Sequence, residues 1–210
     1  MTMQFKHQFY NLELFFEIQN LEKVRKYINC NSFVLDAGAN IGNHTVYFSK
    51  MCGAKKVYAY EPLKPVYDML CKNVELNNID NVECHNVALG EKSGRATIDT
   101  FHSSNLGGTS FKEDSSGKFI LTSLDEQNFE NLNFCKIDVE GHQLQLLKGA
   151  EKTLAKFKPI LWIEMLSTEN FGKNDLEELI KPKKLLEEYG YVLKEQLTNI
   201  DYIYIHKDNL

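Results

Sequence analysis

Long apolar runs are missing from this 210-residue sequence. A membrane-spanning helix needs about 18 or more consecutive apolar residues, and no stretch reaches that length. The N-terminal segment mixes charged residues such as Lys6 and Glu13 into its apolar residues, unlike a secretory signal peptide. We therefore expect a cytoplasmic protein without a membrane span.

Closely spaced cysteines are also missing. The five cysteines, an odd number, lie at positions 30, 52, 71, 84 and 135, and no two form a C-x-x-C pair. Several fall inside apolar strand or helix patterns, so we expect reduced, buried thiols. Transition-metal ligand spacing is absent as well. Three carboxylates could hold a magnesium ion, but no spacing demands one, and we assign no metal.

An excess of positive charge is lacking too, because 24 lysines and arginines face 29 aspartates and glutamates, for a net charge of −5. General nucleic-acid binders are usually basic, so we expect no nucleic-acid partner. The composition that remains, 43% hydrophobic and 25% charged, is typical of a soluble globular protein. The length fits one domain with a sizeable core.

Strand and helix patterns alternate along the chain. Apolar runs predict strands at 33–35, 56–61, 82–87, 134–139 and 159–165, and helical spacing predicts helices at about 65–77, 144–154 and 176–189. Pro182 is expected to kink or break the last helix. Such alternation indicates an α/β sheet with helices on both faces. Two further strands, after Gly190 and at 200–206, predict an antiparallel hairpin at the sheet edge.

Two segments have weaker patterns. Residues 1–30 are rich in aromatics and end in helical spacing, so we expect a docking segment that covers one end of the sheet. The alternative is that this segment lines a substrate pocket. Residues 94–101 suggest a hairpin, and residues 102–118, with many serines and glycines, predict one long mobile loop. The expected division is a segment at 1–30 and one catalytic domain at 31–210.

The chain is organised around the ten residues 33–42, Phe-Val-Leu-Asp-Ala-Gly-Ala-Asn-Ile-Gly. A buried strand ends near Asp36, and Gly38 and Gly42 bracket a turn that leads into a helix. Glycine lets the backbone turn sharply and lets a ligand approach the main chain. A strand, a glycine turn and a helix start together predict a nucleotide-type site at the carboxyl end of a parallel strand.

The charge of this turn distinguishes between cofactors. The spacing D-x-G-x-x-x-G differs from the dinucleotide pattern G-x-G-x-x-G, with Asn40 in place of the second glycine. Asp36 would repel a pyrophosphate but would attract the sulfonium and ammonium of S-adenosylmethionine. Glu61 closes the second strand and can accept hydrogen bonds from both ribose hydroxyls, worth roughly 1.5–3 kcal/mol each. We therefore expect S-adenosylmethionine rather than NAD.

Several stretches resemble the FkbM-type S-adenosylmethionine-dependent methyltransferases. The matching stretches are 34–45, 60–62, 86–90, 123–125, 136–141 (Lys-Ile-Asp-Val-Glu-Gly), 147–150 and 163–164. The resemblance covers about residues 33–195. It implies a class I methyltransferase (Rossmann-like) fold, with a seven-stranded, mostly parallel sheet, helices on both faces and an antiparallel C-terminal edge hairpin. It also implies O-methylation of a sugar, a polysaccharide precursor or a small natural product.

The resemblance implies a set of cofactor-binding residues. Residues of the glycine turn would surround the methionine part, Glu61 would bind the ribose, and residues 86–88 would lie near the adenine. The full set is Asp36, Gly38, Ala39, Asn40, Gly42, Asn43, Thr45, Glu61, Pro62, Asn86, Ala88 and Asp138. The chain departs from the family after Glu140-Gly141, where a small or apolar residue and a glutamate are frequent and His142 and Gln143 stand here.

Methyl transfer to a hydroxyl requires a positioned acceptor and a group that takes up its proton. Asp138 and Glu140 lie at the end of the predicted fourth strand, beside the cofactor strand. Being two residues apart, they should point to one side and repel, so that one holds a proton near neutral pH. We predict Asp138, Glu140 and His142 as catalytic residues. The alternative is that both carboxylates cap the next helix and pair with Lys136 or Lys148.

Other functions compete with O-methylation. An N-methyltransferase or RNA methyltransferase is disfavoured because the Asn-Pro-Pro-aromatic motif of many amino-group methylators is absent and the chain is acidic. A non-catalytic S-adenosylmethionine-binding protein and an NAD-dependent oxidoreductase are the remaining alternatives. The expected partner is a small-molecule or carbohydrate substrate, while the acceptor, the methylated position and the oligomeric state are left open.

Overall fold

The computed structural model of the chain describes residues 15–100, 109–165 and 173–210. The N-terminal aromatics before Phe15 and residues 102–108 of the predicted loop lie outside these ranges. Among the described residues, no helix has the length and apolar character needed to cross a membrane. The five cysteines are free thiols, of which Cys30 is exposed and Cys135 is buried.

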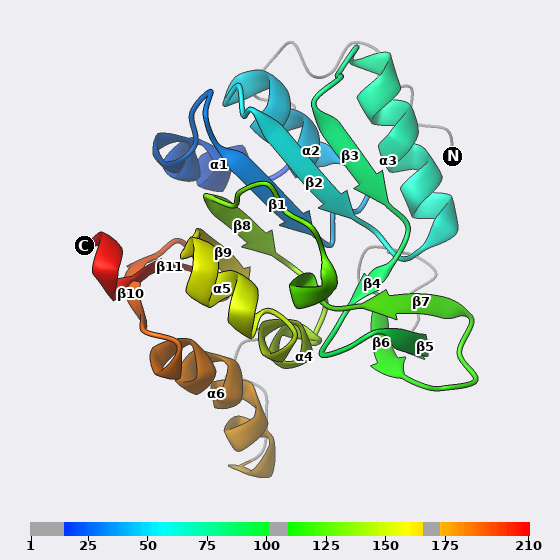
Figure 1. Cartoon of the computed structure of the whole chain (residues 1–210), viewed down its shortest axis with the longest axis vertical. Coiled ribbons are helices and arrows are strands. Elements are labelled where there is room, and N and C mark those ends of the chain that lie inside the picture. The colour runs from blue at the N-terminus through cyan, green and yellow to red at the C-terminus, as the bar shows by residue number, and fades with distance from the viewer. Residues whose placement is uncertain (1–14, 101–108, 166–172) are drawn as a thin grey trace.

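A seven-stranded sheet forms the centre of the molecule (Figure 1). Its strand order is β10-β11-β9-β8-β1-β2-β3. The bounds are β1 Phe33–Ala37, β2 Lys56–Tyr60, β3 Val82–His85, β8 Phe134–Ile137, β9 Ile160–Glu164, β10 Tyr191–Gln196 and β11 Asp201–His206. The pairs β10–β11 and β11–β9 are antiparallel and the other described pairs of this sheet are parallel, so the predicted parallel sheet with a C-terminal antiparallel hairpin is confirmed.

Helices cover both faces of this sheet, as predicted. They are α1 Ile18–Val24, α2 Asn43–Val46, α3 Lys64–Leu76, α4 Gln143–Lys148, α5 Glu151–Phe157 and α6 Lys173–Glu188. Val34 and Val57 face one apolar cluster with α1 and the segment after α2, whereas Leu35 faces the other, with α4, α5 and α6. A break at Pro182 is excluded, because α6 runs through this residue as one helix, while a kink there stays a prediction.

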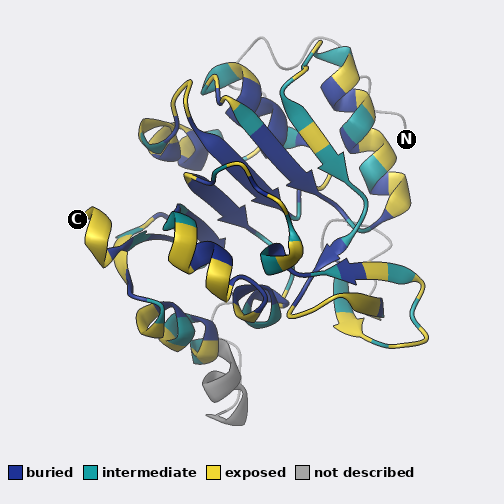
Figure 2. Cartoon of the chain, viewed as in Figure 1, coloured by how far each residue is buried: buried dark blue, intermediate teal, exposed yellow. Residues whose placement is uncertain are grey.

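Burial on both faces explains why the central strands have continuous apolar sequences. All five residues of β1 are buried, and so are all four of β8 (Figure 2). Successive side chains of a strand point to opposite faces, so each strand contributes to both apolar clusters. This packing fixes the carboxyl ends of β1, β2, β8 and β9 at one edge of the sheet, where the site lies.

A second, four-stranded sheet lies beyond this edge. Its order is β4-β7-β5-β6, with β4 Ala88–Leu89, β5 Gly94–Thr100, β6 Ser110–Glu113 and β7 Phe119–Thr122. The predicted loop at 102–118 is therefore wrong over residues 110–113, which pair with β5. Phe111 anchors this strand, since its ring lies 4.9 Å from that of Phe119 in an edge-to-face contact.

The described part of the N-terminal segment, from Phe15 onward, packs against the main sheet. Phe15 is buried, and its ring lies 5.2 Å from that of Tyr47. Leu21 and Val24 of α1 are fully buried in the same cluster. The segment therefore docks on the face of β1 that also carries α2.

Candidate functional site

A cavity of about 580 Å³ lies at the carboxyl ends of β1, β2, β8 and β9. One part of its wall comes from the turns after β1, β2 and β3. The other part comes from the N-terminal segment, from β6 and from the residues after β8 and β9. The lining residues used below are Phe16, Glu17, Gly38, Ala39, Asn40, Asn43, His44, Glu61, Pro62, Ala88, Thr109, Phe111, Lys136, Asp138, Glu140, His142 and Glu164.

The glycine turn brings two strand ends into contact. Gly38 has φ +81°, and a Cβ at this position would lie 1.7 Å from the backbone oxygen of Asp138. The Gly38 N–H donates to the Tyr60 carbonyl at 3.0 Å, which ties the turn to β2. Only glycine fits here, because both the backbone conformation and the close approach exclude a side chain. The turn therefore places Asp138 beside the predicted cofactor loop.

Glu61 is fixed by two backbone donors. Its carboxylate accepts the Asn40 N–H at 3.0 Å and the Leu63 N–H at 2.9 Å. A carboxylate has about four lone-pair positions, so each oxygen keeps one for a ligand donor. Burial raises the pKa of Glu61 to about 7, although the two backbone hydrogen bonds lower it. The charges of Asp36 and Asp138 add to the rise.

Asp36 lies beneath the turn rather than on the cavity wall. It is fully buried, and one oxygen accepts the Thr45 hydroxyl at 2.5 Å, while the other has no hydrogen-bond partner in the structure. Its charge contributes to the raised pKa values of Glu61 and Lys136. Asp36 therefore acts on the cavity through its electric field.

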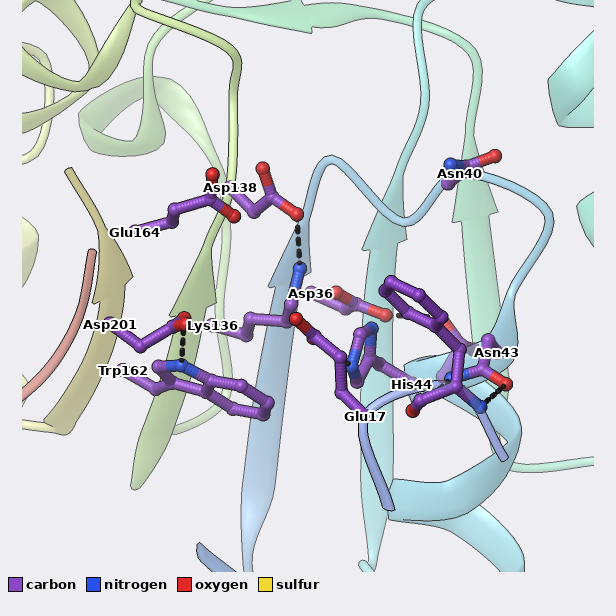
Figure 3. A network of polar contacts seen from close by, with 12 residues as sticks. Glu17, Asp36, Asn40, Asn43, His44, Lys136, Asp138, Trp162, Glu164 and Asp201 are labelled. Carbon is purple, nitrogen blue, oxygen red and sulfur yellow. Dashed lines mark hydrogen bonds and ion pairs between the residues drawn. The ribbon is translucent and has the colours of Figure 1, made fainter. Parts of the chain in front are cut away.

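A buried ion pair lies under the junction of β8 and β9 (Figure 3). The Lys136 ammonium contacts Asp138 at 2.9 Å, and the Lys136 side chain is 4% exposed. Burial alone would raise the pKa of Asp138, but the Lys136 charge outweighs it and holds this pKa below its ordinary value. Burial alone would lower the pKa of Lys136, and Asp138 and Asp36 raise it instead. Asp138 is therefore a charged carboxylate at neutral pH.

Glu164 ends β9 next to Asp138. Figure 3 shows the two carboxyl groups side by side, and after the Lys136 charge the interaction with Glu164 also lowers the pKa of Asp138. Burial, followed by the Asp138 charge, raises the pKa of Glu164 to about 8. The sequence predicts that Asp138 or Glu140 holds a proton near neutral pH. In the structure Lys136 keeps Asp138 ionised, and the carboxyl group beside it with a raised pKa is Glu164.

The turn after β8 determines where Glu140 and His142 lie. The strand ends at Ile137, and Glu140 has φ +47°. The expectation that Asp138 and Glu140 point to one side of a strand is therefore wrong. Both nevertheless line the cavity, as does His142. The Nε2 atom of His142 is buried without a hydrogen-bond partner, and burial lowers the pKa of its imidazole. His142 is therefore neutral near pH 7.

The N-terminal segment contributes two residues to the cavity wall. The Asn43 side chain accepts the Phe16 N–H at 3.1 Å and donates to the Phe16 carbonyl at 3.2 Å. The His44 Nε2 atom lies 3.3 Å from a Glu17 carboxylate oxygen. These contacts hold residues 16 and 17 over α2, where both line the cavity, and the role of the whole segment 1–30 stays a prediction.

The predicted cofactor residues fall into two groups. Those that line the cavity are Gly38, Ala39, Asn40, Asn43, Glu61, Pro62, Ala88 and Asp138. Those outside the lining are Asp36, Gly42, Thr45 and Asn86. Asn86 donates to the carbonyls of Glu61 and Pro62 at 2.8 and 3.0 Å, so it shapes the turn after β2. This second group supports the wall from behind.

Sequence reasoning missed Thr109 and Phe111, which reach the cavity from β6 and the residue before it. A short strand with one apolar anchor gives no pattern that places it near the glycine turn. Within the described ranges, no cluster of three or more His, Cys, Asp or Glu residues could hold a metal ion.

Comparisons with known proteins agree with this geometry. Residues 36–193 match the model of the methyltransferase FkbM domain. "Methyltransferase 1" of Beauveria bassiana (strain ARSEF 2860) is 24% identical over 149 residues, which cover 58% of this chain and 59% of that protein. The chain spans about three fifths of the length of the curated relatives that it matches.

Two solved structures share the fold. The FkbM methyltransferase of Methylobacillus flagellatus KT superimposes with a TM-score of 0.58 at 17% identity, over 98% of this chain and 56% of that one. SMU.1697c of Streptococcus mutans, crystallised with S-adenosylhomocysteine, has a TM-score of 0.52 at 15% identity, over 89% and 93%. The family match covers most of the chain, including the glycine turn, Glu61, Asp138 and Glu164. This chain belongs to the FkbM methyltransferase family.

Proposed function

We propose that this chain is an S-adenosylmethionine-dependent O-methyltransferase that acts on a sugar, a polysaccharide precursor or a small natural product. The observation that carries the proposal is one continuous cavity that joins the glycine turn and Glu61 to the carboxyl groups after β8 and β9. Its volume of about 580 Å³ lies within the range of small-molecule sites. We also propose that residues 31–210 form the catalytic domain and that residues 1–30 lie on the substrate side.

The residues of the first half of the cavity fit S-adenosylmethionine. Gly38 lines the cavity with φ +81°, so the main chain of the turn faces a ligand without an intervening side chain. Glu61 is held in place by two backbone donors and retains lone pairs for ribose hydroxyls. The carboxylates of Asp36 and Asp138 favour a cationic ligand over a pyrophosphate.

The residues of the second half of the cavity suit a hydroxyl acceptor. When bound, S-adenosylmethionine supplies an electrophilic methyl group, so the protein has to position the acceptor oxygen and take its proton. Asp138, charged and fixed by Lys136, can orient the hydroxyl. His142, neutral and unpartnered at Nε2, is the group best able to accept the proton and pass it to water.

Aromatic side chains beside these polar groups favour an acceptor with apolar faces. Phe16 is 70% exposed although it lines the cavity, and Phe111 lies on the wall formed by the second sheet. Sugars and many natural products combine hydroxyl groups with apolar ring faces. A binding site that holds both kinds of surface fits such acceptors better than a phosphorylated one.

Mass spectrometry tests the proposal. The protein is incubated with S-adenosylmethionine that carries a ¹³C-labelled methyl group and with panels of sugars, nucleotide sugars and natural products. The expected product is a methyl ether that retains the label, together with S-adenosylhomocysteine. Label found only on nitrogen or on RNA, with oxygen acceptors unmodified, would contradict the proposed reaction.

A further inference from the structure

The contact between Asp138 and Glu164 places two carboxyl groups at one point of the cavity wall (Figure 3). Two ionised carboxylates in contact repel strongly, so such a pair is stable with one proton between them. Lys136 contacts Asp138 at 2.9 Å and is almost fully buried. Since this ammonium needs a charged partner, the proton belongs to Glu164, and the three groups together are electrically neutral.

The other charged groups around Glu164 come from three elements. Lys136 and Asp138 belong to β8 and the residue after it, Glu140 to the following turn, and Asp201 to β11. Asp201 accepts hydrogen bonds from Trp162 Nε1 at 2.8 Å and from the Thr198 hydroxyl at 2.7 Å. Three negative groups and one positive group face Glu164, which favours its neutral form.

A separate observation points to a ligand at this wall. His142, only 9% exposed, lines the same cavity, and its Nε2 atom has no hydrogen-bond partner. A buried polar atom without a partner costs about 1–3 kcal/mol, a penalty that a bound hydrogen-bond donor would remove. Carboxyl oxygens and a neutral imidazole nitrogen are all acceptors, so the complementary ligand offers donors.

We propose that Glu164 is a positioning residue of the acceptor site, a neutral carboxyl group that donates its proton to Asp138 and leaves the pair with a single negative charge. The remaining oxygens of the pair, with His142 Nε2, accept hydrogen bonds from hydroxyl groups of an uncharged acceptor. A phosphate or carboxylate on the acceptor would face Asp138 without a donor to offer. This assignment of the acceptor class rests on the proposed function, whereas the proton on Glu164 does not.

Carboxyl ¹³C NMR tests the proton directly. The labelled protein, saturated with S-adenosylhomocysteine so that Glu61 is occupied, is titrated from pH 5 to 10. One glutamate resonance should titrate with a midpoint near 8, and it should disappear in Glu164→Gln but persist in Glu188→Gln, an exposed control. A Glu164 midpoint near 4.5 overturns the proposal. If S-adenosylhomocysteine does not bind, the proposed function fails, and titration of the free protein still tests Glu164.

Saturation-transfer NMR tests the acceptor class. Uncharged methyl glycosides are compared with glucose 1-phosphate and glucuronate on the protein saturated with S-adenosylhomocysteine. At least one glycoside should bind, and the charged sugars should not. Glu164→Gln, which keeps a neutral donor, should bind the glycoside within about threefold of wild type, whereas Glu164→Ala should bind it about tenfold more weakly. Preference for the charged sugars, no binding of any glycoside, or equal loss in both variants overturns the proposal.

Discussion

Among single residues, Lys136 and Asp138 each stabilise the charged form of the other: Lys136 lowers the pKa of Asp138, and Asp138 raises the pKa of Lys136. Lys136 keeps Asp138 ionised, and Asp138 allows an ammonium to be buried. Removing one partner of a buried ion pair leaves an uncompensated charge, which typically costs 3–5 kcal/mol. Asp138 is partly exposed, with 27% of its side chain accessible, so the loss should lie at the low end of this range.

Asp138→Asn should therefore lower the free energy of unfolding by about 3 kcal/mol and turnover by about 10²–10⁴-fold. Chemical denaturation and steady-state kinetics measure the two effects. The double variant Lys136→Met/Asp138→Asn should recover most of the stability and none of the turnover. Recovery of turnover in the double variant would assign Asp138 a purely structural role.

Glu61 provides a pH dependence at the same scale. Its pKa of about 7 means that the carboxyl group is largely protonated below pH 7 in the free protein. Ribose donors and a cationic ligand favour the carboxylate, so affinity for S-adenosylmethionine should rise with pH through about 7 and level off above it. Calorimetry at pH 6, 7 and 8 should also detect proton release on binding.

The matched variant is Glu61→Gln, which keeps the shape of the side chain. Its affinity should be about 10–100-fold weaker at pH 8, since one charged acceptor is worth about 1.5–3 kcal/mol. It should also be nearly independent of pH. Equal wild-type affinity at pH 6 and 8 would place Glu61 outside the cofactor site.

At the scale of elements, the contact between the turns after β1 and β8 determines the site. Gly38→Ala would place a Cβ 1.7 Å from the Asp138 carbonyl oxygen and would also strain a positive φ. We expect a loss of about 2–4 kcal/mol in unfolding free energy, because overpacking costs about 1–3 kcal/mol and a non-glycine residue there about 1 more. S-adenosylmethionine binding should also fall below detection.

Gly94→Ala is the control for this variant, because a Cβ at Gly94 would meet no atom within 4 Å. It should leave both stability and cofactor affinity close to wild type. Thermal denaturation and calorimetry of the two variants provide the comparison. Wild-type affinity in Gly38→Ala would mean that the turn can move away from Asp138, and that the close approach does not shape the cofactor site.

The strand, turn and helix around Asp36 could be predicted from the sequence, because each has a clear local pattern. The apolar run before Asp36 and the spacing of Gly38 and Gly42 predict a strand, a turn and a helix, and these are found. Strand β6 escapes prediction because its four residues hold one apolar anchor, Phe111, and its pairing with β5 supplies the rest. Pro182 predicts a kink or a break, and the continuous helix α6 excludes only the break.

At the scale of the whole molecule, the site depends on strand order. Asp138 and Glu164 lie 26 positions apart in the sequence, and they meet because β8 and β9 are parallel neighbours that end at the same edge. Sequence spacing can suggest that both are strand-end residues. It does not reveal that Lys136 keeps Asp138 charged, which leaves Glu164 as the carboxyl group to hold the proton. That assignment requires the distances.

The same order brings the glycine turn, Glu61 and the carboxyl pair around one cavity. The parallel strands β1, β2, β8 and β9 all end at this edge, and the second sheet closes it from beyond β3. A cofactor and an acceptor can therefore occupy adjacent parts of a single site, as methyl transfer requires.

Calorimetry of the wild-type chain at pH 8 measures directly whether this cavity binds S-adenosylmethionine. S-adenosylmethionine and S-adenosylhomocysteine should each bind at one site per chain, and NAD should produce no heat of binding at the same concentration. Tight binding of NAD, without binding of S-adenosylmethionine, to a protein shown to be folded would contradict the account.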